Sequence, residues 1–426
     1  MKSFKEEEEE SSIELALFYI EKSVDVVKGI QILVEEEKKS SFEAAKILGK
    51  LYLQGTHVKK DEKRGKDLLV KAAKCSDDKE ANLLLGYLYL FGIGTKKNRK
   101  TARKYFEKAA SLGSSQALFQ LGCIFENGDG VEVDSAKALQ YYEQSANLGN
   151  SKAQYCVSLK HFEGEGVEVD FRKGLKALEV AAQGDEDAKH HLALFLLSGE
   201  GVEKHVSRAV FLLEEASSLG NHSSSYLLAV LLLKGEVIEK DEKMAVQLLE
   251  RAISQGSEEA LLLLSELYLV GGPVERNFER CAELLERAFS LFSNSTAAYN
   301  LAKLYMRGLG VEKNIEKAFS LLEFSSSQEY GKAQNQLALI YLHDKKDLLK
   351  AKQLFEKAAE NSSEKAKINL AEIFLEGSQQ VPRDIFKAKS LLEEVLLSGN
   401  SNVKTKLELI NKERKVNFLA FNSIHQ

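Results

Sequence analysis

The chain has 426 residues, a formal net charge of −5, two Pro and no Trp. An acidic balance without a stripe of Lys and Arg argues against a nucleic-acid partner, because nucleic-acid binding displaces counterions through clustered cations. Abundant Leu, Ala, Glu and Lys with so little Pro predict an all-helical protein.

The N-terminal part of the chain divides into two expected segments. Residues 1–11 contain a run of Glu and few apolar side chains, which predicts an acidic, disordered tail. Residues 12–43 are expected to form a degenerate half-repeat that caps the N-terminal end of the repeats. In this segment Gly29 precedes Gly65 by one period and is followed by the same apolar pattern.

Residues 44–400 repeat one pattern ten times, at intervals of about 36 residues, which is typical of stacked supersecondary units. Each unit opens with a small residue and continues with apolar residues at helical spacing, which predicts a first helix. A Gly at position twelve, such as Gly92, suits a left-handed helix C-cap. The units start at Ala44, Ala81, Ala117, Ala153, Ala188, Ser224, Ala260, Ala297, Ala333 and Ala366.

A second helix is expected in every unit after the glycine loop. Asp or Asn, as at Asp134 and Asn98, stands ahead of it, and both residue types favour the N-cap because their side-chain oxygen accepts a bond from an unpaired amide. Small residues two turns apart, as at Ala102 and Ala109, predict close helix packing. The repeated carboxylates are therefore assigned to capping and not to catalysis. The ninth unit lacks the glycine loop, which predicts a tighter turn there.

The unit from Ala117 to Gly149 reads AxxxLGxIFxxGxGVxxDxxKAxxYYExSAxxG. With this motif the chain resembles the Sel-one-like repeat family, a relative of the tetratricopeptide repeats, over about residues 44–399. The resemblance implies an all-α solenoid, a right-handed superhelix of about ten antiparallel helix pairs. It also implies a role as an adaptor or scaffold that gathers other proteins. We therefore expect one elongated domain.

Residues 401–426 are expected to close the other end of the repeats. Val403, Leu407 and Ile410 are spaced as one face of a capping helix. The apolar tail that follows, Phe418-Leu419-Ala420-Phe421, either folds back on the last repeat or docks into a partner.

The first helix of each unit commonly lines the inner curve of a helical-repeat solenoid, so its non-core positions predict a partner-binding surface. Alternatively, these side chains pack between neighbouring repeats as core. The predicted binding residues are Tyr87, Leu90, Phe91, Leu159, Phe162, Leu194, Leu197, Val230 and Leu233. Equivalent positions become polar toward the C-terminus, at Lys303, Arg307, Glu372 and Glu376, which suggests a mixed surface.

We predict a non-catalytic scaffold or adaptor that binds proteins or peptides along this concave surface. The alternative is a regulatory subunit that docks an enzyme, such as a ubiquitin ligase or a kinase complex, through its terminal segments. We predict no catalytic, cofactor-binding or metal-binding residue. A zinc site at the adjacent His190 and His191 is disfavoured, because the two side chains point about 100° apart on a helix.

The positions of the Cys residues and the hydropathy of the chain indicate in which cellular compartment the protein is expected. The four Cys occupy unrelated repeat positions, which predicts no ladder of disulfides and a reducing environment. No apolar run approaches the ~20 residues of a membrane helix, and no signal peptide is recognised. The expectation is a monomeric cytoplasmic protein, with a nuclear location left open.

Overall fold

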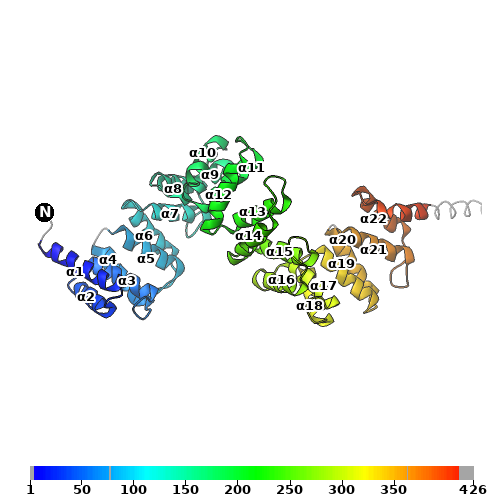
Figure 1. Cartoon of the computed structure of the whole chain (residues 1–426), viewed down its shortest axis with the longest axis horizontal. Coiled ribbons are helices and arrows are strands. Elements are labelled where there is room, and N and C mark those ends of the chain that lie inside the picture. The colour runs from blue at the N-terminus through cyan, green and yellow to red at the C-terminus, as the bar shows by residue number, and fades with distance from the viewer. Residues whose placement is uncertain (1–3, 76–77, 362, 412–426) are drawn as a thin grey trace, which may run out of the picture. The chain divides into compact units, whose positions relative to one another are not determined.

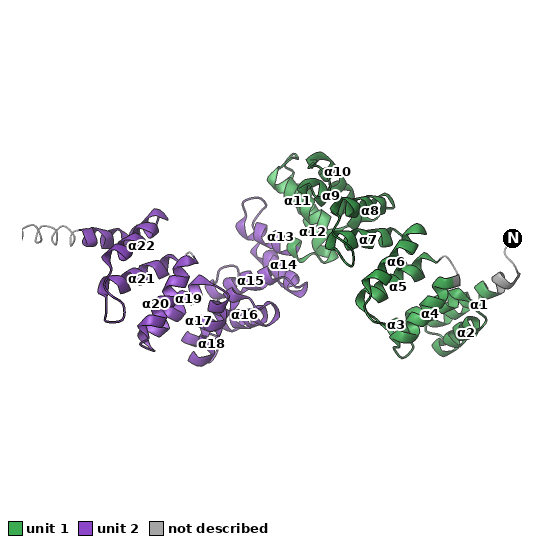
Figure 2. Ribbon diagram, turned by 180° about the vertical axis from the view of Figure 1, so that it is seen from behind, with its two compact units in different colours: residues 1–224 green, residues 225–426 purple. Residues whose placement is uncertain are grey.

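The computed structural model describes residues 4–75, 78–361 and 363–411, and within these ranges all regular secondary structure is helical (Figure 1). The chain divides into two compact units, Met1–Ser224 and Ser225–Gln426 (Figure 2). This division falls in the first turn of α13 (His222–Lys234). The all-α repeat architecture predicted from the sequence is confirmed.

The first unit contains α1 (Phe4–Glu21), α2 (Val26–Lys38), α3 (Phe42–Gln54), α4 (Glu62–Cys75), α5 (Lys79–Phe91), α6 (Arg99–Ser111), α7 (Ser115–Asn127), α8 (Ser135–Asn147), α9 (Ser151–Glu163), α10 (Phe171–Ala181), α11 (Glu186–Ser198) and α12 (Val206–Leu219). The second unit continues with α14 (Glu242–Ser254), α15 (Glu258–Val270), α16 (Phe278–Phe292), α17 (Ser295–Arg307), α18 (Ile315–Ser327), α19 (Gly331–His343), α20 (Leu348–Glu360), α21 (Glu364–Glu376) and α22 (Ile385–Leu397). From α3 onward, odd-numbered helices are the first helices of the repeats (A helices), and even-numbered helices are the second (B helices).

The N-terminal segment differs from the expectation. α1 begins at Phe4, so residues 4–11, which we expected to be disordered, lie in a helix. Glu has a high helix propensity, which favours a helix over this part of the sequence. α1 and α2 form a complete helix pair, in which Ile20 and Leu33 are buried against Leu48 of α3. The segment therefore caps the first repeat with two helices.

The C-terminal segment keeps its expected apolar face. A short 3₁₀ turn (Ser401–Val403) follows α22, and helical structure continues over residues 404–411. The predicted face is buried at Val403, Leu407 and Ile410. The apolar tail at 418–421 lies outside the described residues.

Side-chain caps begin nearly every helix of the repeats. Asp134 accepts a hydrogen bond from the Lys137 amide at 2.9 Å, as predicted for the B helices. The A helices are capped in the same way, for example by Ser114 from the Ala117 amide at 3.2 Å. In the fifth repeat, which lacks the usual Asp, the ring of His205 accepts from the Arg208 amide and caps α12.

In five of the repeats, a second glycine of the loop packs against the repeat before it. Gly92 ends α5 in the left-handed conformation, with φ 78°. A Cβ atom on Gly94, two places on, would lie 2.3 Å from the backbone oxygen of Glu62 in the first turn of α4. A side chain is therefore excluded where the loop packs on the preceding B helix. The other glycines at this position that lie against the preceding B helix are Gly130, Gly166, Gly201 and Gly310.

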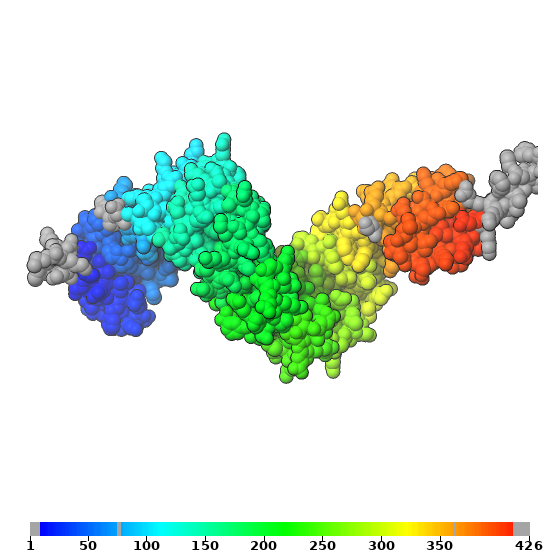
Figure 3. All heavy atoms as spheres, turned by 90° about the horizontal axis from the view of Figure 1, so that it is seen from above, coloured from blue at the N-terminus to red at the C-terminus, as the bar shows by residue number. Residues whose placement is uncertain are grey.

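The ninth repeat has the tighter turn that its missing glycine predicted. Residues 344–347 connect α19 to α20, whereas residues 308–314 connect the corresponding helices α17 and α18. On the face that Figure 3 draws, neighbouring repeats within each unit pack directly against one another.

Candidate functional site

The nine residues predicted to bind a partner lie on A helices, and we call them the A-helix face. Seven of them belong to the first unit, on α5, α9 and α11, and Val230 and Leu233 belong to α13 in the second unit. Phe91 is 65% exposed and Leu194 38%, whereas the other members are half-buried. The A-helix face therefore combines two solvent-exposed apolar side chains with residues that share in the packing.

On α5, Tyr87 packs and Phe91 is presented to solvent. The ring of Tyr87 meets the buried ring of Phe106 edge to face, with centroids 5.3 Å apart. The side chains of Gln116 and Gln120 hydrogen-bond to Tyr87, and burial raises the pKa of its phenol. Phe91 stacks on the outer side of Tyr87 at 6.2 Å. Phe91 thus presents a solvent-exposed ring that lies parallel to the half-buried ring of Tyr87.

On α9, Phe162 is a packing residue and does not present an open apolar surface. Its ring contacts Phe171 at 5.1 Å and Phe195 at 5.2 Å. Gly174 of α10 leaves room for the ring, because a Cβ there would lie 2.6 Å from it. Phe162 therefore packs between neighbouring repeats as core, which is the alternative given above for these side chains.

A polar cluster lies one turn before Leu194 on α11. The Tyr155 hydroxyl lies 2.6 Å from Nδ1 of His191, and the two rings stack at 5.4 Å. His190 Nδ1 lies 2.9 Å from the Ser224 hydroxyl. Burial lowers the pKa of His190 to about 4, with smaller contributions from His191 and His222 in the same direction and from Asp187 in the opposite one. The His190 side chain is therefore uncharged at neutral pH.

The Tyr155–His191 contact was not foreseen from the sequence. The two residues stand at repeat positions three and four of neighbouring units, a spacing of 36 residues that marks adjacent A helices. The only available signal was this spacing, because pairing across repeats depends on how far each helix is rotated about its own axis.

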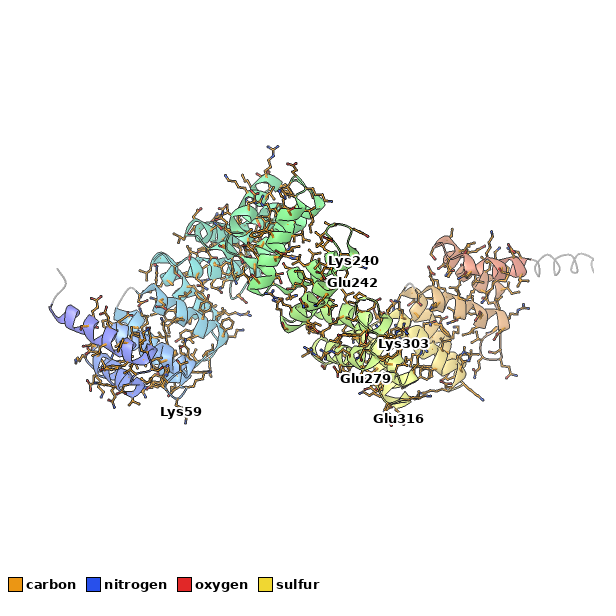
Figure 4. All side chains as sticks on the ribbon, in the orientation of Figure 1. Lys59, Lys240, Glu242, Glu279, Lys303 and Glu316 are labelled. Atoms are coloured by element: carbon orange, nitrogen blue, oxygen red, sulfur yellow. The ribbon has the colours of Figure 1, made fainter. Side chains whose placement is uncertain are left out.

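The polar positions near the C-terminus divide into two pairs. Lys303, labelled in Figure 4, and Arg307 follow one another by one turn on α17, and the Lys303 ammonium lies 5.5 Å from the ring centroid of Tyr299. Glu372 of α21 instead forms an ion pair with Lys406, and Glu376 is exposed at the end of α21. The basic pair and the acidic pair therefore have different surroundings.

Side chains of metal-ligating types and two partly or fully buried thiols bear on covalent and metal chemistry. Within the described ranges, no group of three or more His, Cys, Asp and Glu side chains is arranged to hold a metal ion. Burial raises the pKa of the Cys156 thiol to about 12 and that of Cys281 to about 11. Both thiols are protonated at neutral pH and are weak nucleophiles. In the same ranges, every helix is too short or too polar to cross a bilayer.

Comparison with known proteins identifies the repeat. The profile of the Sel1 repeat family matches ten consecutive segments of this chain. These segments are residues 43–77, 79–114, 115–150, 151–185, 186–221, 222–257, 258–291, 295–330, 331–363 and 365–394.

Two solved structures support the same assignment. A protective antigen of uropathogenic Escherichia coli strains that displays an SLR fold is 27% identical, with a TM-score of 0.67 over 89% of this chain and 82% of its own. A Sel1 repeat protein from Oxalobacter formigenes is 27% identical, with a TM-score of 0.53 over 76% of this chain and 93% of its own. Among curated proteins, none matches this chain significantly. The chain therefore belongs to the Sel1 repeat family, whose members are generally protein-interaction scaffolds and typically non-catalytic.

Proposed function

We propose that the protein is a non-catalytic scaffold or adaptor that holds another protein or a peptide on its A-helix face. The observation that carries the proposal is the exposure of Phe91, which keeps 65% of its surface in solvent and lies parallel to the ring of Tyr87. An oriented, exposed aromatic ring is the kind of anchor that contributes most to protein–protein affinity. Leu194 adds a second exposed apolar contact on α11.

The experiment that tests this proposal changes only exposed side chains, so that loss of a partner is not caused by loss of packing. Phe91→Ser and Leu194→Ser are combined in the full-length chain, and Phe211→Ser serves as the matched control. Phe211 is 57% exposed but lies on a B helix, α12, so it has comparable exposure outside the A-helix face. Affinity purification with mass spectrometry from the source organism compares both variants with the wild type.

We expect the Phe91→Ser/Leu194→Ser variant to lose its partners and the control to keep them, with equal helical circular dichroism in both. If both variants keep the same partners, or both lose them, the A-helix face does not bind a partner and the proposal is wrong.

A second candidate, a regulatory subunit that docks through its terminal segments, is favoured by the outer face of the N-terminal helix pair. Leu15 and Phe18 of α1 are 46% and 52% exposed, and Val24, just before α2, and Val27, in its first turn, are also exposed. Deleting α1 would uncover the core, because Ile20 packs inward, so Leu15→Ser/Phe18→Ser is the sharper test. Loss of partners in this variant alone would favour terminal docking.

The proposal includes a monomeric protein in a reducing compartment such as the cytoplasm. Cys123, Cys156 and Cys281 are free thiols, which supports that compartment. Light scattering coupled to size-exclusion chromatography measures the oligomeric state, and a dimer mass would contradict this part of the proposal.

A further inference from the structure

Four cationic side chains gather on the A helices of repeats eight to ten, in the second unit. Lys303 and Arg307 lie on α17, Lys332 on α19 and Lys365 on α21. Lys303 is half-buried and the other three are exposed. We call these four residues the basic cluster.

The basic cluster has two carboxylates nearby, Glu329 and Glu364, but forms no ion pair with them within the described residues. None of its four side chains forms an ion pair with a carboxylate within the described ranges, whereas Lys189, for example, reaches Glu215 at 2.7 Å. Burial lowers the pKa of Lys303, and the charges of Arg307, Lys365 and Lys332 lower it further. The chain as a whole has a net charge of −5, yet these four cations repel one another. A bound anion would relieve that repulsion.

Two cavities adjoin the basic cluster. The first, of about 360 Å³, lies between α15, α16 and α17, with Leu269, Leu285 and Leu304 in its walls and Lys303 and Arg307 at its side. Its lining is mostly apolar, so it suits an apolar side chain.

The second cavity, of about 570 Å³, is lined by Tyr299 and Tyr330 together with Lys332 and Lys365. Glu329 and Glu364 also line it. The carboxylate of Glu364 is already bound, because it accepts from the Ser398 hydroxyl at 2.7 Å and from the Asn400 amide at 2.9 Å.

Tyr299 lines the second cavity and lies close to Lys303, which lines the first. Its ring lies 5.5 Å from the Lys303 ammonium on one side and 5.5 Å from the Tyr330 ring on the other. An extended ligand can therefore contact Lys303 and the side chains of α19 along one continuous strip of the second unit.

We infer that repeats eight to ten bind an acidic peptide segment, whose carboxylates contact the basic cluster while a neighbouring apolar side chain enters the cavity beside α17. This inference rests on the proposed scaffold function and names the chemical class of one partner. A nucleic acid fits less well, because four cations make a short track and the apolar cavity offers nothing to a phosphate backbone.

The experiment measures binding of labelled peptide pools to the full-length chain by fluorescence anisotropy. One pool carries Asp and Glu around a degenerate apolar position occupied by Leu, Ile, Val or Phe. A second pool replaces the acids by Asn and Gln, and a third replaces the apolar position by Ala. Poly(U) RNA is measured in parallel.

Two charge-reversal variants provide the comparison. Arg307→Glu/Lys332→Glu changes two exposed members of the basic cluster. Lys243→Glu/Lys313→Glu is the matched control, because it makes the same change in net charge at exposed sites of the same unit outside the basic cluster. Circular dichroism verifies that both variants keep the helical content of the wild type.

We expect the acidic apolar pool to bind the wild type most tightly, and to bind the cluster variant at least about tenfold more weakly with the control little changed. If peptide binding weakens equally in both variants, the loss comes from the change in net charge and not from the basic cluster, and the inference is wrong. No preference for the acidic pool over the amide pool, or tighter binding of poly(U), would also overturn it. Any of these failures leaves the proposed function standing if Phe91→Ser/Leu194→Ser still abolishes partner capture.

Discussion

Gly122 of α7 lies directly against the ring of Tyr142 on α8, so that a Cβ atom on the glycine would lie 2.4 Å from Cε1 of the tyrosine. Tyr142 is fully buried, and its hydroxyl donates to Glu126 at 2.6 Å, so the ring cannot move away. Gly86 and Phe106 repeat this relationship one unit earlier. Where a repeat has Ala or Ser at the glycine position, as at Ala193, the facing residue is usually Leu.

Substituting Gly122→Ala should therefore destabilise the protein. Ala favours the helix by about 1 kcal/mol relative to Gly, but overpacking against a fixed ring costs about 1–3 kcal/mol, so we expect a net loss of about 1 kcal/mol. Urea denaturation followed by circular dichroism measures it. Adding Tyr142→Leu to the Gly122→Ala variant should recover stability, and a double variant that is no more stable than Gly122→Ala alone would contradict the packing argument.

Phe162 and Phe91 should respond differently to truncation, although both are Phe residues of the A-helix face. Phe162→Ala removes a ring held between Phe171 and Phe195, and we expect a loss of about 2–3 kcal/mol, below the value for a fully buried Phe. Phe91→Ala should cost less than about 0.5 kcal/mol, because the ring is exposed. Thermal denaturation measures both, and equal losses would mean that Phe91 is also core.

Acid should weaken the first unit through His190. The pKa of His190 is lowered by burial from 6.5 to about 4, so the unfolded chain takes up a proton near pH 6.5 while the folded chain does not. Stability is therefore retained above pH 6.5 and falls as the pH falls toward 4. We expect a loss of about 1–2 kcal/mol, since solvent screens a half-buried side chain.

Urea denaturation at pH 7.0, 5.5 and 4.5 tests this dependence. His190→Gln should flatten the profile of the wild type, whereas His343→Gln, at an exposed histidine, should leave it unchanged. If wild type and His190→Gln lose stability in parallel, His190 is not the group responsible.

The N-cap of α12 can be improved. His205 accepts from the Arg208 amide at 3.2 Å, at a position where most other B helices use Asp or Asn. His205→Asp should raise stability by about 1 kcal/mol, through a stronger cap and a favourable charge at the helix N-terminus. His205→Ala should lower stability by about 0.5–1 kcal/mol. The melting temperatures of the two variants should move in opposite directions, and a shared direction would contradict the capping role.

Local chemistry made much of the repeat predictable. The Asp134 cap and the left-handed Gly92 follow from short-range hydrogen bonding and sterics, which a single unit of sequence displays. The A-helix caps such as Ser114 were missed, although Ser, Asp or Asn stands three residues before the small first residue in nine of the ten units. The helix at residues 4–11 was also missed, because composition alone does not separate a charged helix from a charged coil.

The candidate site was less predictable than the fold. Helical spacing placed Phe91 and Phe162 on A helices, but it could not show that one ring is exposed and the other lies in an aromatic trio. That difference depends on Gly174 and Phe195, which belong to other helices, and therefore on how neighbouring helices pack. The basic cluster was indicated only at Lys303 and Arg307, since Lys332 and Lys365 join it across repeats.

The contact between Gly94 and the backbone of Glu62 bears on how such a chain can grow. At Gly94, Gly166 and Gly310 the joint is made with main-chain atoms, so a repeat that brings such a glycine depends little on the side chains in the first turn of the preceding B helix. Duplication or exchange of genetic segments would then lengthen the array without matching side chains at the new junction. A repeat that lacks this glycine, such as the ninth, would instead have to be duplicated together with the repeat before it.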